Sequence, residues 1–203
     1  MSVLPKELTT ADRLVRRFKK YTIGYLHIDL VYTPKFVLPD GTKKRWYVFT
    51  CIDRVSKLAY VWLADKKTQW MGKEFLEKVL KFYPYKINYI LTDNGLEFTY
   101  KAKARKTHKV HPFDQVCRKH RTIRVAHPWT NGMVERFNQK IKPNVIRRYL
   151  FQNVKELNSK LISYVNSYNF TIKLQQLNRL SPVSYLDKRY QKRLLKRPQR
   201  IVN

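Results

Sequence analysis

The order of hydrophobic periods along the chain restricts its fold more than any other feature. Three segments near the start have the alternation or the aromatic and β-branched composition of β-strands: residues 25–32, 46–53 and 58–63. The turn signal Pro39-Asp40-Gly41 separates the first two, and a short polar stretch separates the second from the third. Three strands joined in this way predict an antiparallel meander.

A helical period comes next, and the chain then returns to a strand. Thr68 is placed to cap this helix and Pro84 to end it. The apolar side chains of the helix recur every three or four residues, at Met71, Phe75, Val79 and Phe82. Residues 87–92 predict a fourth strand, parallel to its neighbour because a helix connects them. A short fifth strand is expected at residues 123–126.

Two more helices complete the core pattern. Thr130 or Asn131 can cap the first, and Pro143 is expected to kink or interrupt it. Its apolar stripe consists of Val134, Phe137, Ile141 and Val145. A further helix follows from Val154 to Tyr168. The order of three strands, a helix, a strand and more helices predicts an α/β fold with a mixed sheet flanked by helices.

The charge of the chain indicates a polyanionic partner. Its 203 residues hold 43 Lys and Arg against 14 Asp and Glu, a net charge of +29. Nucleic acid is the first candidate, ahead of an acidic membrane surface or a general role such as that of a basic ribosomal protein. The basic residues are spread along the whole chain, which favours a polymer on a broad surface over a membrane-surface helix.

Other partners and cofactors are not indicated. No uncharged apolar run is long enough to cross a bilayer, and two cysteines do not make a disulfide framework. The five glycines are never closer than 17 residues, so we expect no glycine-rich loop for a nucleotide cofactor.

Three acidic residues stand out by position. Asp29 lies inside the first strand, Asp93 directly follows the fourth, and Glu135 lies in the first turn of a helix. If the first and fourth strands are neighbours, the two aspartates lie side by side and the helix brings Glu135 over the same edge. Three such carboxylates repel one another unless a cation joins them. Oxygen ligands select Mg²⁺ or Mn²⁺, and two ions about 4 Å apart suit phosphoryl transfer. The structural alternatives are an edge-strand charge, a turn residue and a helix-terminal acid.

At these residues the sequence resembles the DDE-type transposases of bacterial insertion sequences, within the retroviral integrase superfamily. The matching segments are HIDLVY (27–32), YVFTCIDRVSKLAYV (47–61), LTDNGLEF (91–98), HPFDQVC (111–117) and HPWTNGMVERFNQKIK (127–142). The resemblance runs from about Tyr21 to about Leu186. It implies a ribonuclease-H-like fold with a five-stranded sheet, and catalytic, metal-binding acids at Asp29, Asp93 and Glu135. It also implies hydrolysis at a transposon end that frees a 3′-OH, which then attacks a phosphodiester in target DNA.

The resemblance and the composition predict four regions. A basic leader covers residues 1–20, the catalytic core 21–150, a helical extension of the core 151–187 and a basic tail 188–203. Family members usually carry a helix-turn-helix module before the core, and a leader of about 20 residues is too short for one. The 42-residue step from Asp93 to Glu135 is longer than in many members of the superfamily.

The helix that carries Glu135 is also expected to contact DNA. Glu135, Asn138, Gln139 and Lys142 share one face at helical spacing. We expect DNA contacts from Arg136, Asn138, Lys140 and Lys142. Relatives from retroviruses often have lysine at the position of Gln139, and a solvated helix face is the alternative interpretation.

Three other groups of residues are assigned structural roles. Asp53 resembles a structural acid that pairs with Arg54 or another neighbour, and Glu97 is close enough in sequence to Asp93 to support it. A zinc site is disfavoured because the available ligands are too tightly spaced and lack paired cysteines: His108, His111, Cys117 and His120. His111, Phe113 and Cys117 are instead expected to anchor their loop on the core.

The sequence therefore predicts a DDE polynucleotidyl transferase of a mobile element. Its expected cofactor is Mg²⁺ or Mn²⁺, its partners transposon ends and target DNA, and its state a homo-multimer associated with the nucleoid in bacterial cytoplasm. One alternative is a truncated, non-catalytic DNA-binding remnant that modulates a full-length transposase. Another is a ribonuclease-H-like nuclease, which cuts DNA strands without joining them.

Overall fold

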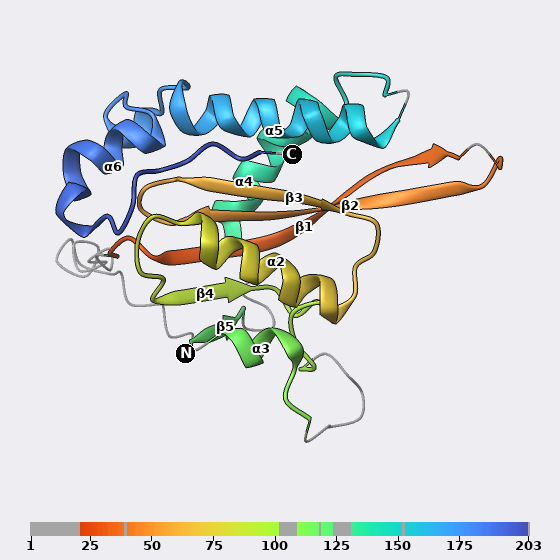
Figure 1. Cartoon of the computed structure of the whole chain (residues 1–203), viewed down its shortest axis with the longest axis horizontal. Coiled ribbons are helices and arrows are strands. Elements are labelled where there is room, and N and C mark those ends of the chain that lie inside the picture. The colour runs from red at the N-terminus through yellow and green to blue at the C-terminus, as the bar shows by residue number, and fades with distance from the viewer. Residues whose placement is uncertain are drawn as a thin grey trace, which may run out of the picture.

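A five-stranded mixed sheet is the frame of the structure. The computed structural model describes residues 21–38, 40–101, 109–117, 119–123, 131–151 and 153–202. The strands lie in the order β3-β2-β1-β4-β5, with helices on both faces (Figure 1). The strands are β1 (Tyr25–Val37), β2 (Lys43–Asp53), β3 (Ala59–Ala64), β4 (Tyr89–Thr92) and β5 (His120–Thr122). The larger helices are α2 (Gln69–Phe82), α3 (Pro112–Val116), α4 (Gly132–Ile141), α5 (Val154–Phe170) and α6 (Pro182–Tyr190).

The pairing of the strands follows the predicted meander and crossover. β1 and β3 both pair antiparallel with β2, whereas β4 pairs parallel with β1. The parallel pair forms because the chain crosses from β3 to β4 through α2. The sheet is therefore antiparallel on one side of β1 and parallel on the other, which confirms the mixed sheet.

The fifth strand does not lie where the sequence predicts it. The structure places β5 at His120–Thr122, parallel to β4, and Ile123 follows it; residues 124–126 are outside the described part. Polar contacts hold β5 in the sheet, so its sequence does not need the alternation of apolar residues that would predict a strand. His120 bonds the Thr92 hydroxyl at 2.9 Å and the Asp114 carboxylate at 2.6 Å.

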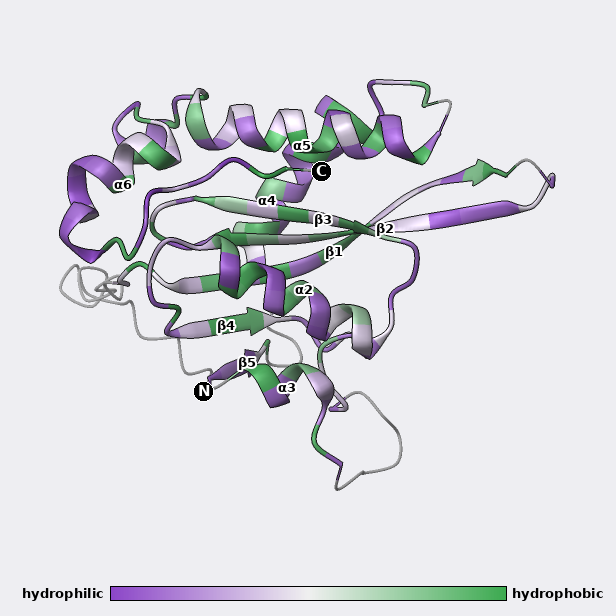
Figure 2. Ribbon diagram, in the orientation of Figure 1, coloured by the Kyte–Doolittle hydropathy of each residue, from purple (hydrophilic) through white to green (hydrophobic). Residues whose placement is uncertain are grey.

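Alternate side chains of the strands enter two separate apolar cores. On one face, α2 packs on a core that includes Ile28, Phe49 and Phe75. On the other face, α4 and α5 pack on a core that includes Val31 and Phe137. Figure 2 shows the mixed hydrophobic and hydrophilic character of these helices, as expected for elements with one buried face.

Proline ends α4 in the predicted place. The stripe Val134, Phe137, Ile141 and Val145 is buried. A π-helical turn, Lys142–Ile146, follows α4 and contains Pro143. Proline has no backbone N–H to donate within the helix, so the regular hydrogen-bond pattern stops here. Within the described ranges, no helix has the length and apolar character needed to cross a membrane.

The C-terminal segments pack on the same sheet. Asn169 of α5 brackets the Ala59 backbone of β3, accepting from its N–H at 2.9 Å and donating to its carbonyl at 2.7 Å. Three residues earlier in α5, the buried Asn166 makes the same two-way contact with Ile201, at 2.8 and 2.9 Å. Two short 3₁₀ helices, Gln175–Leu177 and Gln191–Arg193, flank α6. The basic segment after α6 therefore returns across α5 and is anchored there.

Candidate active site

Asp29 is a partly buried carboxylate on the α4 face of β1. Its neighbour Ile28 enters the α2 core, and Val31, two residues after Asp29, enters the α4 core, so the alternation aims Asp29 toward α4. The Oδ1 atom accepts the Leu30 N–H at 2.8 Å, and Oδ2 accepts the side-chain amide of Asn138 at 2.8 Å. Two donors on two elements thus fix the carboxylate.

Asp93 follows the last residue of β4. Its Oδ1 atom accepts the Gly95 N–H at 3.0 Å, which makes a tight Asx turn. The adjacent Asn94 donates its side-chain amide to the Ile123 carbonyl at 3.2 Å, which ties this turn to the end of β5. The Asp93 carboxylate is therefore held at the end of the parallel pair of strands.

The parallel register brings the two aspartates together. Tyr25 of β1 lies opposite Tyr89 of β4, and Asp29 and Asp93 each follow these partners by four residues. The two carboxylates therefore stand at the same level of adjacent strands. α4 lies over the neighbouring β1 and β2 and carries Glu135, an exposed residue, in its first turn.

Asp93 and Glu135 both act on the ionisation of Asp29. Burial, with a smaller contribution from the charges of Asp93 and Glu135, raises the pKa of Asp29 to about 6, while hydrogen bonds from Leu30 and Asn138 oppose the shift. Like charges that disfavour ionisation of a carboxylate are what a bound cation would neutralise.

The oxygen atoms at this site are ligands that suit a hard divalent cation, but the side chains do not converge tightly on one point. Within the part of the chain that the structure describes, no three His, Cys, Asp or Glu side chains converge tightly enough to hold a metal ion. The Asn138 Oδ1 atom is buried without a hydrogen-bond partner among the described residues, beside the Asp29 carboxylate. Carboxylate and amide oxygens are the ligands that Mg²⁺ prefers. The residues that could hold a cation are Asp29 and Asp93, with Glu135 as the third.

The residues expected to contact DNA occupy different environments. Asn138 is only 4% exposed and bonds Asp29, as described above. Arg136, Lys140 and Lys142 are exposed. The Lys140 ammonium lies 5.8 Å from the ring of Tyr168 in α5. Three of the four residues therefore present charge to solvent, and Asn138 faces the acids.

His27, for which the sequence predicted no role, also lies in this site. It stands two residues before Asp29 on the same face of β1 and is fully buried. Burial, with a smaller contribution from the Arg54 guanidinium 3.4 Å from Nε2, lowers its pKa to about 4, whereas Asn131 opposes the shift. His27 and Asp29 are two residues apart in β1, so the alternation that placed Asp29 on the site face also placed His27 there.

Asp53 was expected to pair with Arg54 or another neighbour, and in the described structure its partners are backbone groups rather than the Arg54 side chain. The buried carboxylate accepts backbone N–H groups of Gly24 at 2.7 Å, Val55 at 2.8 Å and Ser56 at 2.6 Å. Burial raises the pKa of Asp53, and these hydrogen bonds oppose the shift. Asp53 therefore holds the turn after β2, which confirms its structural role.

The loop before β5 is anchored as expected. His111 is buried and caps α3 by accepting the Phe113 N–H at 3.1 Å, and Phe113 is in the α2 core. His108 lies outside the described residues.

Glu97 is buried, and burial and then the Asp93 charge raise its pKa. Its carbonyl lies so close to α2 that a side chain on Gly72 would collide with it, at 2.1 Å.

Comparison with known proteins matches the part of the chain that carries the candidate active site. Residues 22–128 match a family model described as "Integrase core domain", and residues 117–182 match a second model with the same description. A protein named as an integrase, ORF3 of Spiroplasma virus SpV1-C74, is 27% identical over an alignment of 183 residues that covers 84% of this chain. The chain spans about half, 49%, of that relative.

Solved structures of retroviral integrases share the fold. The HTLV-2 integrase catalytic core domain, in complex with magnesium, has 18% identity and a TM-score of 0.54, over 79% of this chain and 94% of that one. The catalytic core domain of BIV integrase has 15% identity and a TM-score of 0.57, over 83% and 97%. These likenesses establish the ribonuclease-H-like integrase core fold. Because the first family model alone covers more than half of the sequence, this chain belongs to the integrase core domain family, within the DDE transposase and integrase superfamily.

Proposed function

We propose that this chain is a catalytic core that cleaves DNA strands and transfers them in DNA integration, with Asp29, Asp93 and Glu135 as its catalytic acids. The observation that carries the proposal is the level placement of Asp29 and Asp93 on parallel strands, with Glu135 near enough to act on the pKa of Asp29. A phosphodiester lying along this edge meets all three carboxylates from one side.

Mg²⁺ or Mn²⁺ would be held by Asp29 and Asp93, with Glu135 as the third ligand. When bound, such ions activate an attacking oxygen and stabilise the leaving oxygen of a phosphodiester. The HTLV-2 integrase catalytic core domain, solved in complex with magnesium, supports this choice of cofactor.

Asn138 acts as a positioning residue for Asp29 in this proposal. Its amide N–H holds one carboxylate oxygen at 2.8 Å, and the backbone of Leu30 holds the other. A carboxylate held by two donors keeps its orientation and its preference for the ionised form.

The DNA substrate binds through the cationic surface. The net charge of +29 attracts a polyanion, and Arg136, Lys140 and Lys142 are exposed on α4 and the turn after it. Assembly as a homo-multimer on transposon ends and target DNA is part of the proposal. A solved retroviral relative is described as an intasome, the simian T-cell lymphotropic virus complex. We place the chain at the nucleoid of bacterial cytoplasm on the basis of its partner.

Product analysis tests the proposed activity. A labelled DNA end with a free 3′-OH is mixed with a supercoiled plasmid, the protein and Mg²⁺ or Mn²⁺. Joined products support strand transfer, and cut plasmid without joining identifies a nuclease instead. DNA binding with neither product in either metal would support a non-catalytic remnant and contradict the proposal.

A further inference from the structure

The distal ends of β1 and β2 form a two-stranded arm that extends beyond the other strands (Figure 1). We define the arm as residues 33–37 and 43–46. Lys35, Phe36 and Val37 pair with Arg45, Lys44 and Lys43. In the described structure β3 pairs with β2 only as far as Tyr47, so the arm has no third strand.

The inner face of the arm is occupied by packing. Phe36 and Trp46 meet edge to face with ring centroids 5.5 Å apart, and Phe36 also lies 6.5 Å from the ring of Phe151. Lys44 shares this face, where its ammonium pairs with Asp65 at 3.1 Å. This face anchors the arm on the body of the molecule.

The outer face carries unneutralised positive charge. Directly opposed residues of antiparallel strands share a face, so Lys35 and Arg45 lie together with the next pair, Val37 and Lys43. All four are exposed, and Val37 is 66% exposed. In the part of the chain that the structure describes, no ion pair neutralises the three cations.

An exposed tyrosine extends this face at the base of the arm. Tyr32 lies opposite Tyr47 and is 47% exposed. The Arg45 guanidinium lies 5.8 Å from its ring, and the Lys67 ammonium lies 5.0 Å from the ring and donates to the Tyr32 hydroxyl at 2.6 Å. Cations held beside an aromatic ring, with N–H groups left over, are suited to phosphate contacts.

The arm begins close to the candidate active site. Tyr32 follows Asp29 by three residues, roughly 10 Å along a strand. The arm continues from there past the edge where Asp29 and Asp93 lie. Tyr32 lies on the face of β1 opposite Asp29, so a duplex whose phosphodiester reaches the acids meets the outer face of the arm beyond the sheet, where the two-stranded ribbon stands clear of it.

We propose that the outer face of the arm, with Lys35, Lys43, Arg45 and Lys67, docks on duplex DNA that flanks the reacting phosphodiester. The inference rests on the proposed function, in which DNA is the substrate. A two-stranded ribbon fits the major groove, and cations on one face of it reach the phosphates along that groove. Duplex DNA is chosen because the surface is cationic, ribbon-shaped and continuous with the acid-bearing strand.

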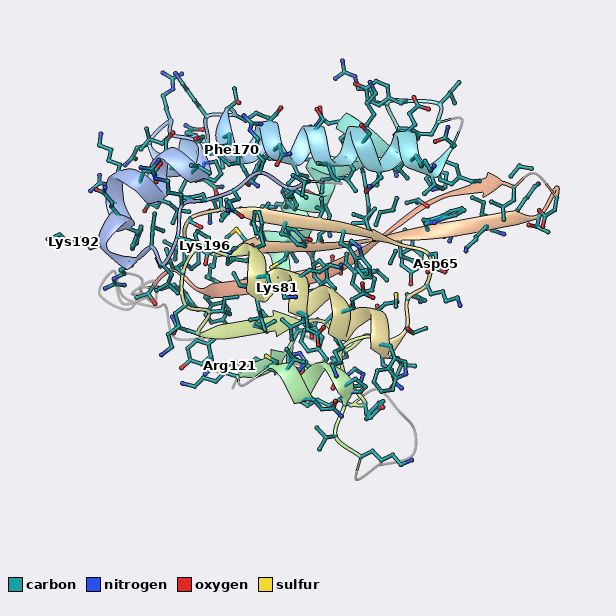
Figure 3. All side chains as sticks on the ribbon, in the orientation of Figure 1. Asp65, Lys81, Arg121, Phe170, Lys192 and Lys196 are labelled. Carbon is teal, nitrogen blue, oxygen red and sulfur yellow. The ribbon has the colours of Figure 1, made fainter. Side chains whose placement is uncertain are left out.

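A matched pair of triple variants tests the proposal by salt dependence. The arm variant carries Lys35→Gln, Lys43→Gln and Arg45→Gln. The control carries Lys188→Gln, Lys192→Gln and Arg193→Gln, three exposed cations near the opposite end, where Figure 3 labels Lys192 far from Asp65 at the base of the arm. Both variants remove three charges, so only their location differs.

In a plot of log affinity for duplex DNA against log salt, we expect the arm variant to make the slope shallower by about 2 to 3. Each phosphate contact contributes about 0.9 to that slope. The control should flatten it by less than about 1. Equal changes in the two variants would overturn the docking surface while leaving the proposed function intact. A wild-type chain that binds no DNA would overturn both.

A photo-cross-linker gives a second, direct readout. Placed at Val37 on the arm, it should cross-link duplex DNA in a complex that has the Asp93→Asn change to block turnover. The same cross-linker at Leu195, which is 78% exposed, should not. Cross-linking of Val37 to a second copy of the chain instead of DNA would overturn the proposal.

Discussion

The side-chain amide of Asn138 in α4 donates a 2.8 Å hydrogen bond to the carboxylate of Asp29 in β1, 109 residues earlier in the chain. This bond connects the helix that carries Glu135 to the strand that carries the first acid. The position of the helix and the orientation of the carboxylate therefore depend on each other.

Replacing Asn138 should impair catalysis more than DNA binding. We expect Asn138→Ala to lower the rate of strand transfer by about 10- to 100-fold, because groups that orient metal ligands have effects of this size. Affinity for DNA should change by less than about threefold. The matched control is Gln139→Ala, an exposed neighbour on the same helix, which should retain the full rate. A folded Asn138→Ala protein with unchanged strand transfer would contradict the positioning role.

The stability of the metal-free chain should depend on the ionisation of Asp29. Its pKa is raised from 3.8 to about 6 on folding, so the folded state holds an extra proton between these values and the free energy of unfolding falls as pH rises through them. In EDTA, Asp29→Asn should therefore be more stable than the wild type at pH 8 by on the order of 2 kcal/mol, and equal to it near pH 4. Thermal unfolding of both proteins across this pH range measures the difference.

The same experiment with Mg²⁺ gives a control. Added Mg²⁺ should stabilise the wild type at pH 8, because a cation that binds the folded state favours it, and should not stabilise Asp29→Asn to the same extent. Equal stabilisation of the two proteins would show that Asp29 is not a ligand.

Asp53 should matter for stability alone. It accepts three backbone N–H groups in a fully buried turn, and Asp53→Ala leaves these donors unpaired. We expect a loss of about 2 to 4 kcal/mol in the free energy of unfolding, measured in urea. Asp40→Ala, at an exposed turn, should change it by less than about 0.5 kcal/mol. If Asp53→Ala lowered the free energy of unfolding by no more than Asp40→Ala does, the structural role of Asp53 would be refuted.

Affinity for DNA should fall steeply with salt. The net charge of +29 implies many phosphate contacts, and a slope of about −5 or steeper is expected for log affinity against log salt. Titrations of a fluorescent duplex between about 50 and 200 mM salt measure it. Affinity that barely changes over this range would contradict an electrostatic DNA interface.

The arrangement of Asp29 and Asp93 could be predicted from the sequence because local patterns determine it. The alternation in β1 and the helical crossover before β4 together predict adjacent parallel strands with both acids at one edge. β5 could not be placed in the same way, because its contacts are polar and come from Thr92 and Asp114 on other elements.

The partners of buried polar groups were the other information missing from the sequence. Asp53 has an arginine beside it in sequence, yet backbone amides surround it once the turn closes. Asn138 was expected to face DNA, and the packing of α4 turns it toward Asp29. The rotation of a helix about its axis depends on tertiary packing that spacing alone does not specify.

Strand transfer by single-acid variants shows whether the three acids act as one site. A pre-cut DNA end is incubated with target plasmid in Mg²⁺, Mn²⁺ or EDTA, with the wild type, Asp29→Asn, Asp93→Asn, Glu135→Gln and the exposed control Glu77→Gln. The account predicts metal-dependent joining by the wild type and Glu77→Gln, and a loss of at least about 10³-fold in the other three, which retain DNA binding. Full activity in any one of those three would contradict the claim that Asp29, Asp93 and Glu135 form one catalytic site.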